Sequence, residues 1–209
     1  MKPSKIPRVV IYRLSIYLRA LNSLSADGIH TVSSESFGKL VGVKPAQIRK
    51  DLAYFGQFGI KGVGYKVQDL LEKIISILGT ERAHRVALVG VGNLGRALLA
   101  YKGFEKRGFQ IVAAFDPVHC GKKAGKNGPA VSHPRDLPRL VGEQKIEIGI
   151  IAVPAAGAQE VADDMVKAGI ESILNFAPVR LVLPEKVSVE NIDLSIGLET
   201  LSYALKTES

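Results

Sequence analysis

The chain has 209 residues, of which 46% are hydrophobic and 23% charged, and this composition excludes an intrinsically disordered protein. At roughly 100–200 residues per domain, the length allows one large domain or two modest ones. The single cysteine, Cys120, excludes an intramolecular disulfide and a thiolate metal cluster. No apolar run reaches the roughly 18 residues of a membrane span, and the basic N-terminus lacks the apolar stretch of a signal peptide. We therefore expect a cytoplasmic protein with no membrane and no metal among its partners.

The formal net charge of +8 is distributed unevenly along the chain. Residues 1–80 hold 12 Lys and Arg against 5 Asp and Glu, whereas residues 81–209 hold 16 against 15. Such asymmetry favours a module that binds a polyanion, joined to a nearly neutral module. On charge alone, a solvated basic face explains the excess equally well.

Three helices are predicted in the first 55 residues. Apolar residues spaced by three and four predict an amphipathic helix over Arg8–Ala26, and Asp27-Gly28 ends it. Ser33 and Ser34 are suitable N-caps for a short second helix. After a turn at Gly42-Val43, the third helix covers Pro45–Phe55, because proline is favoured in a first helical turn.

The second and third helices resemble a helix-turn-helix. In the third, Gln47 is suited to pair with adenine and Arg49 with guanine. Lys50 is suited to a phosphate, and Tyr54 is presented alongside them. We expect these four residues to contact DNA.

Residues 57–67 are rich in glycine and lysine, with apolar residues in alternation. They predict a short β-hairpin that forms the wing of a winged helix, where glycines admit the backbone close to the sugar-phosphate. We assign Lys61, Gly62 and Tyr65 to DNA contact; the alternative is a plain hairpin that stabilises a small core. A closing helix is expected over Val67–Leu78.

The second module carries a glycine motif between a strand and a helix. The buried-strand run His84–Val89 is followed at once by G-x-G-x-x-G and then by a helical pattern. Glycines in such a motif permit the sharp turn, the approach of a pyrophosphate and the packing of helix on strand. The helix N-terminus favours the phosphates. The residues assigned to the cofactor are Gly90, Val91, Gly92, Asn93, Leu94 and Gly95.

An acidic residue ends the next predicted strand, Gln110–Phe115. Asp116 lies 21 residues after Gly95, close to the ~20 expected of a carboxylate that binds the ribose. Because a carboxylate repels a 2′-phosphate, NAD(H) is favoured over NADP(H). Lys122 and Lys123 leave a phosphate possible, and a Rossmann-like domain with a vestigial site is the alternative.

Strand–helix alternation continues to the end of the chain, with strands at 147–153 and 172–175 and a helix at 155–168. Residues 117–133 are expected to form a surface excursion. The fold class is α/β with a mainly parallel sheet. A last helix carries leucines at intervals of four, three and four, and either covers its own core or crosses to a partner subunit. The expected divisions are a winged helix-turn-helix domain at 1–80, a Rossmann-like dinucleotide-binding domain at 81–192 and a C-terminal helix at 193–209.

Two other functions are weighed against a DNA-binding sensor. An NAD-dependent oxidoreductase carrying an extra DNA-binding domain needs a substrate pocket with an acid–base residue. Only about fifteen residues follow the Rossmann strands, and the four histidines form no catalytic set. We therefore expect no enzyme. A thiol sensor acting through Cys120 lacks a resolving cysteine.

Several segments closely resemble the bacterial redox-sensing transcriptional repressor family Rex, and the resemblance covers essentially the whole chain. They are Arg49–Gly56, Gly62–Tyr65, the glycine motif Gly90–Gly95 and Ile173–Val179. The resemblance implies a homodimer on a palindromic double-stranded operator, with the C-terminal helix swapped onto the partner subunit. It also implies that NADH and NAD+ are regulatory ligands and that repression is relieved when NADH rises relative to NAD+.

The resemblance also implies roles for individual residues. Arg49 and Lys50 match the family's major-groove and backbone contacts, Lys61 with Gly62 matches its wing contact, and Asp116 matches its ribose carboxylate. Tyr101 and Asp193 match a pair that meets across the dimer in the NADH-bound form. The chain departs from the pattern twice. Leu194 stands where some members have a phenylalanine close to the nicotinamide, and Asn93 stands where at least one member has arginine, so that an ion pair is lost there.

Overall fold

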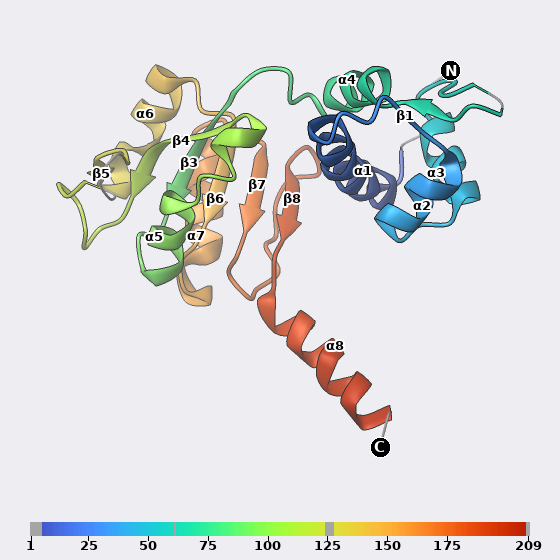
Figure 1. The fold of residues 1–209 in the computed structure, drawn as a ribbon. Coiled ribbons are helices and arrows are strands. Elements are labelled where there is room, and N and C mark those ends of the chain that lie inside the picture. The colour runs from blue at the N-terminus through green and yellow to red at the C-terminus, as the bar shows by residue number, and fades with distance from the viewer. Residues whose placement is uncertain (1–5, 61, 124–127, 208–209) are drawn as a thin grey trace. The chain divides into compact units, whose positions relative to one another are not determined.

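The computed structural model describes residues 6–60, 62–123 and 128–207. The chain divides into two compact units, Met1–Arg82 and Ala83–Ser209. The first is largely helical and the second contains a parallel sheet with helices (Figure 1). Each unit has hydrophobic core residues of its own. The predicted α/β class is confirmed.

The described residues of the first unit form four helices: α1 (Arg8–Ala26), α2 (Ser34–Val41), α3 (Pro45–Ala53) and α4 (Val67–Leu78). Ser33 caps α2, because its side chain accepts a hydrogen bond from the Ser36 N–H. Gly42 ends α2 in the left-handed conformation at φ 68°. The third helix is shorter than predicted and ends before Tyr54, its C-cap. The core between these helices includes Tyr17, Phe37, Ile48, Leu52 and Ile74.

Residues 57–67 were predicted to pair with each other as a hairpin, but the strand in this segment pairs with an earlier part of the chain. Strand β2 (Tyr65–Lys66) pairs with β1 (Thr31–Val32), antiparallel, and the hairpin itself retains one isolated bridge, Ile60 to Gly64. The cause lies in Tyr65, which is 3% exposed and meets the ring of Phe37 edge-on. Burying this ring anchors β2 to the helical core rather than to the start of the wing.

A buried carboxylate joins α3 to α1. Asp51 is fully buried, and its two oxygens accept hydrogen bonds from Arg13 Nε (2.5 Å), Arg13 Nη2 (2.7 Å), the Tyr17 hydroxyl (2.8 Å) and Gln47 Nε2 (2.7 Å). Burial by itself raises the pKa of Asp51, but the bonds from Arg13, Gln47 and Tyr17 outweigh it and hold that pKa below its ordinary value. Burial and the bond to Asp51 raise the pKa of Tyr17. The ionised carboxylate therefore fixes one face of α3 on α1.

The second unit contains six strands in the order β5-β4-β3-β6-β7-β8, and every neighbouring pair is parallel. The strands are β3 (His84–Val89), β4 (Phe109–Phe115), β5 (Val131–Ser132), β6 (Ile148–Ile151), β7 (Ser172–Asn175) and β8 (Ser188–Asn191). The helices are α5 (Asn93–Ala100), α6 (Leu137–Gln144), α7 (Ala155–Lys167) and α8 (Leu194–Thr207), with 3-10 turns η1 (Glu105–Arg107) and η2 (Pro134–Asp136). The chain moves outward from β3 in one direction and then resumes at β6 on its other side. A ligand crevice is expected at such a switch point, outside the carboxyl ends of the strands.

Both faces of the sheet are covered. Along β3, Val86 and Leu88 join the core that contains Leu98 and Leu99 of α5, while Ala87 and Val89 join the core under α6 and α7. This alternation follows from the two-residue period of a strand. Strands β5 and β8 and helix α6 were not predicted from the sequence, and Val131, within residues 117–133 that were expected at the surface, is buried.

Two glycines bring α5 close to the sheet. A Cβ at Gly95 would overlap the carbonyl oxygen of Gly90, and a Cβ at Gly90 would lie 2.5 Å from the carbonyl oxygen of Ala152. Gly90 also has φ 100°, a conformation that other residues rarely adopt. The glycine loop therefore packs backbone against backbone at the carboxyl edge of β3 and β6.

In the described part of the chain, no helix combines the length and the apolarity that crossing a membrane requires. The same residues hold no group of three or more His, Cys, Asp or Glu placed to bind a metal ion.

We expect Gly95→Ala to lower the free energy of unfolding of the second unit by about 2 kcal/mol, because the new methyl group meets a backbone oxygen that cannot move aside. Urea unfolding followed by circular dichroism measures this. Gly157→Ala on α7 is the matched control, since its Cβ would find its nearest neighbour at 3.9 Å, and helix propensity then favours alanine by up to about 1 kcal/mol. Equal effects of the two variants would contradict the close packing.

We expect Asp51→Ala to lower the free energy of unfolding by about 3 kcal/mol or more, because it leaves the Arg13 charge without its buried partner. The pKa of Asp51 is lower in the folded protein than in the unfolded chain. The contribution of Asp51 to the free energy of unfolding is therefore complete above its unfolded pKa of about 4. That contribution is lost as the pH falls through its lower, folded pKa. Urea unfolding at pH 7 and at about pH 3 measures both effects.

The control for this prediction is Glu72→Ala. Gln68 Nε2 donates to Glu72 over 2.8 Å, which is the same amide–carboxylate spacing along a helix, but the pair is exposed. We expect this variant to change stability by less than about 0.5 kcal/mol. An equally small effect of Asp51→Ala would show that the buried cluster does not hold α3.

Candidate functional site

The outer face of α3 is small and basic. Ala46, Arg49, Lys50 and Ala53 are all exposed, and their spacing of three, one and three places them on one side of the helix. The opposite side is anchored through Ile48, Asp51 and Leu52. Two cations between two alanines form a narrow surface that carries positive charge, which suits entry into a groove of a polyanion.

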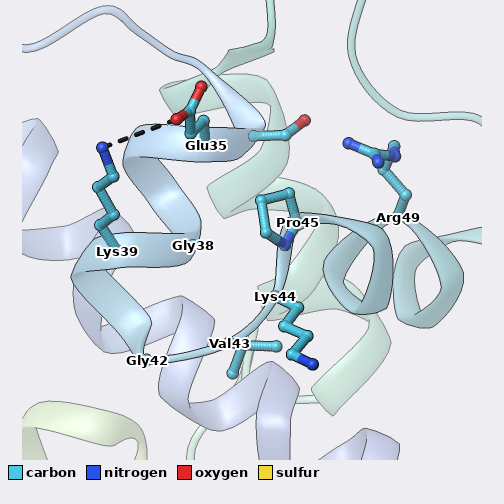
Figure 2. Close-up of a pocket in the computed structure, with 9 residues that line it drawn as sticks. Glu35, Gly38, Lys39, Gly42, Val43, Lys44, Pro45 and Arg49 are labelled. Atoms are coloured by element: carbon cyan, nitrogen blue, oxygen red, sulfur yellow. Dashed lines mark ion pairs between the residues drawn. The ribbon is translucent and has the colours of Figure 1, made fainter.

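Arg49 lies where two surface grooves meet. One, of about 650 Å³, runs between α2 and α3 and is lined also by Lys39 and Lys44; Figure 2 shows it with the exposed Glu35–Lys39 ion pair of 3.7 Å on the α2 side. The other, of about 430 Å³, lies between Arg49, the start of α2 and residues 58–60 and 62–65. Lys39 and Lys44 were not singled out from the sequence, although basic residues in and beside the turn of a helix-turn-helix were a usable signal.

The remaining DNA-contact candidates fall in different environments. Tyr54 is 41% exposed, and Gly62 is exposed with φ 81°. The amide of Gln47 is bound to Asp51 on the side that faces α1. Lys61 lies outside the described residues.

Tyr65 is 3% exposed, although it also lines the groove beside Arg49. Its ring belongs to the core of the first unit, and its hydroxyl accepts a hydrogen bond from Ser34 Oγ over 3.4 Å. The alternation that marked it as a wing residue instead reflects one apolar position turned inward. The ring therefore packs in the core beside β1, the strand with which β2 pairs.

In the second unit, the glycine loop leaves a place for phosphate groups. Gly92 is the N-cap of α5, is exposed and has no heavy atom within 4 Å of a Cβ built on it. No described side chain caps this helix, so its first N–H groups and the positive end of its dipole face the open side. Asn93 is exposed, Leu94 is half-buried, and Val91 and Gly95 are buried. These residues fit the pyrophosphate of a dinucleotide.

Asp116 follows β4 and is 8% exposed. Its Oδ2 accepts the N–H of Val91 over 2.8 Å, and its Oδ1 accepts the N–H groups of Val118 and His119 and the His119 ring Nδ1, each over 2.9 Å. Burial by itself raises the pKa of Asp116. The hydrogen bonds from Val91, His119 and Val118 outweigh burial and hold that pKa below its ordinary value, so the group stays ionised. The predicted ribose carboxylate thus ties the end of β4 to the glycine loop.

Three further residues shape this edge of the sheet. Arg96 donates from its guanidinium to the Asn93 side chain over 2.6 Å and to the Val91 carbonyl over 3.3 Å, which puts a cation beside the loop. His119 covers Asp116, and the fully buried Asn175 donates to the carbonyl oxygens of Ala177 and Val179 and so fixes the turn after β7. For Arg96 the available signal was a basic residue directly after the glycine motif.

The residues expected to form a switch lie on separate elements of the second unit. Tyr101 is the C-cap of α5, is 55% exposed and meets Phe104 edge-on. Asp193 accepts hydrogen bonds from the N–H and hydroxyl of Ser195, which lower its pKa and begin α8. Leu194, the first residue of α8, is exposed.

The large apolar residues of α8 are all strongly exposed in the single chain. They are Leu194, Ile196, Leu198, Leu201, Tyr203 and Leu205, and each is at least 59% exposed. Large exposed apolar patches are typical of surfaces that contact another molecule.

Comparison with known proteins gives both units a family. A family model described as "Putative DNA-binding protein N-terminus" matches residues 5–53, and one described as "CoA binding domain" matches residues 81–179. The redox-sensing transcriptional repressor Rex of Desulforamulus reducens is 51% identical over 207 residues, which cover 98% of each chain. That of Carboxydothermus hydrogenoformans is 50% identical over 210 residues and the full length of both.

Two crystal structures of the protein called RSP match almost the whole chain. The complex with beta-NAD+ and operator DNA has a TM-score of 0.92 at 37% identity, covering 98% of this chain and 94% of that one. The complex with beta-NADH has a TM-score of 0.87 at 36% identity, covering 98% and 96%. RSP is itself described as a Rex-family repressor. With relatives about half identical over nearly all of its length, this chain belongs to the family of redox-sensing transcriptional repressors Rex.

Proposed function

We propose that this chain is a transcriptional repressor that binds operator DNA through its first unit and leaves the DNA when NADH binds to its second. The observation that carries the proposal is that one chain holds both the exposed basic face of α3 and the glycine loop. It also matches, over 98% of its length, a structure that contains beta-NAD+ and operator DNA. The relatives are named as repressors, which favours this function over the alternative NAD-dependent oxidoreductase.

On the DNA, the face of α3 lies in the major groove. Arg49 reads a base edge there, and Lys50 contacts a phosphate. Lys39 and Lys44 border the groove beside Arg49, where they add salt-dependent affinity. Gly62 admits the backbone of the wing close to the sugar-phosphate, and Tyr54 lies beside the basic face. We retain Lys61 as a minor-groove contact on the sequence pattern alone.

In the second unit, the glycine loop and the first turn of α5 bind the pyrophosphate, with Arg96 as an adjacent cation. Asp116 lies at the adenosine ribose and disfavours a 2′-phosphate, so the ligands are NADH and NAD+ rather than their phosphorylated forms. The description of the second unit as a CoA binding domain agrees with this site, because coenzyme A and NAD share an adenosine diphosphate part.

The response to NADH follows from differential affinity. A ligand shifts a conformational equilibrium only as far as it binds one conformation better than the other. A shift from 1:99 to 99:1 requires roughly a 10⁴-fold preference, about 5.5 kcal/mol. NADH and NAD+ differ only at the nicotinamide, in charge and planarity. The contacts that discriminate NADH from NAD+ therefore lie at the nicotinamide end of the ligand, where Leu194 is a candidate. Asp116 contacts the ribose and binds both forms alike.

The active form is a homodimer. Two copies of α3 can then read the half-sites of a palindromic operator about one helical turn apart or a multiple of it. The leucine stripe of α8 supplies the contact, which we assign to a helix exchanged between the subunits. In that dimer Tyr101 of one subunit and Asp193 of the other form the pair that accompanies NADH binding. DNA and the NADH pool place the protein in the cytoplasm.

To test the function, the protein is bound to a palindromic operator fragment, and this complex is titrated with NADH and, separately, with NAD+. We expect the DNA to be released at a much lower concentration of NADH than of NAD+; equal responses would contradict the sensor function.

Arg49→Ala should weaken operator binding by about 1–3 kcal/mol, roughly 5- to 150-fold, while NADH affinity is kept. Arg135→Ala, an exposed arginine in the second unit, is the control and should change neither.

The dimer is tested by placing charge in the stripe of α8. We expect the double variant Leu198→Asp, Leu201→Asp to sediment as a monomer, because burying two carboxylates in an apolar contact is strongly unfavourable. Operator affinity should fall with it. Glu199→Ala, on the same helix and also exposed, should remain a dimer. A double variant that stays dimeric in analytical ultracentrifugation would place the subunit contact elsewhere.

A further inference from the structure

The carboxylate of Asp116 has little capacity left for a ligand. Two ionised oxygens offer about four lone-pair sites for hydrogen bonds. Four donors already occupy this group: three on Oδ1, from Val118 N–H, His119 N–H and the His119 ring, and one on Oδ2, from Val91 N–H. A ribose presents two neighbouring hydroxyl groups to such a carboxylate. With a single donor, Oδ2 can still receive one hydroxyl, but Oδ1 already holds three donors. One donor on Oδ1 therefore has to leave before the second hydroxyl can be received there.

Only one of the four donors can leave without moving the backbone. The Val91 N–H belongs to the glycine loop, which packs directly against neighbouring backbone, and the N–H groups of Val118 and His119 belong to the turn that follows β4. The fourth donor is the imidazole of His119, a side chain that is 33% exposed. It can rotate toward solvent about its own single bonds.

We infer that His119 is a specificity-determining residue for the nucleotide, because its imidazole occupies the place on Asp116 that a ribose hydroxyl takes. This inference rests on the proposed function. In the free protein the ring Nδ1 satisfies Oδ1 over 2.9 Å. When the nucleotide binds, the imidazole turns away, and the hydroxyl replaces its hydrogen bond. His119 therefore lowers the affinity for any ligand with a free ribose and keeps the carboxylate satisfied while no ligand is bound.

Exchange of one donor for another has a modest effect on affinity. The net value of a hydrogen bond to a charged group is about 1.5–3 kcal/mol, and the incoming hydroxyl recovers most of it. We therefore expect that removing the competing imidazole strengthens nucleotide binding by a factor of about 3–10. This gain depends on the hydroxyl groups of the ligand, whereas a general loosening of the turn would affect ligands with and without them equally.

The test compares His119→Ala with the wild-type protein by isothermal titration calorimetry with NADH, ADP and 2′,3′-dideoxy-ADP. We expect NADH and ADP to bind about 3- to 10-fold more tightly and 2′,3′-dideoxy-ADP to bind unchanged. His119→Phe, which keeps a ring but has no donor, should show the same gain for ADP. The control is His133→Ala, which removes another half-buried histidine of the same unit, one whose ring accepts the Arg135 N–H; it should leave all three affinities unchanged.

The outcomes separate this inference from the function on which it rests. If wild-type protein binds NADH but His119→Ala binds it equally or more weakly, the imidazole does not compete with the ribose, and the inference is overturned alone. An equal gain for ADP and for 2′,3′-dideoxy-ADP overturns it as well. If wild-type protein binds no NADH, the proposed function itself is overturned together with the inference.

Discussion

A carboxylate that is taken out of water needs hydrogen-bond donors in its place, and both functional surfaces of this chain are organised by that requirement. In each unit a nearly buried aspartate receives four donors. Asp51 gathers side chains of α1 and α3, and Asp116 gathers N–H groups from two loops and one imidazole. Segments far apart in the sequence are thereby fixed against each other, behind the exposed face of α3 in the first unit and beside the glycine loop in the second.

The two aspartates differ in the kind of donor that satisfies them. Around Asp51 the donors are side chains of the helical unit, and the Arg13 guanidinium makes two of the four bonds. This cluster holds α3 on α1 in one fixed arrangement. Around Asp116 three donors are backbone groups and the fourth is a partly exposed ring. The three backbone donors can therefore hold Asp116 in place when the imidazole is exchanged for another donor. The difference suits a rigid reading surface in one unit and a site that accepts ligands in the other.

Much of this arrangement could be predicted from the sequence, because local signals determine it. Helix periodicity and caps predicted α1 and α2 closely, and the glycine motif between a strand and a helix predicted the loop after β3. The failures have non-local causes. β2 pairs with β1 across more than thirty residues, and β5 and β8 are short strands whose place depends on the sheet beside them. Tyr65 was assigned from the wing pattern and Gln47 from its residue type, and neither signal could predict that the Tyr65 ring packs in the core or that the Gln47 amide binds Asp51. Which hydrogen bonds Asp116 makes was likewise not readable from its spacing.

The pairing of β2 with β1 has a mechanical consequence for the way DNA is held. The base of the wing shares a ladder with the segment that leads into α2, and the buried Tyr65 ring fastens that ladder to the core. Because Ile48 and Leu52 of α3 belong to the same core as Tyr65, we expect α3 and the base of the wing to engage or release a half-site together. In the proposed dimer, we therefore expect an altered distance between half-sites to weaken binding more than an altered base. One inserted base pair turns one half-site by about 35° relative to the other.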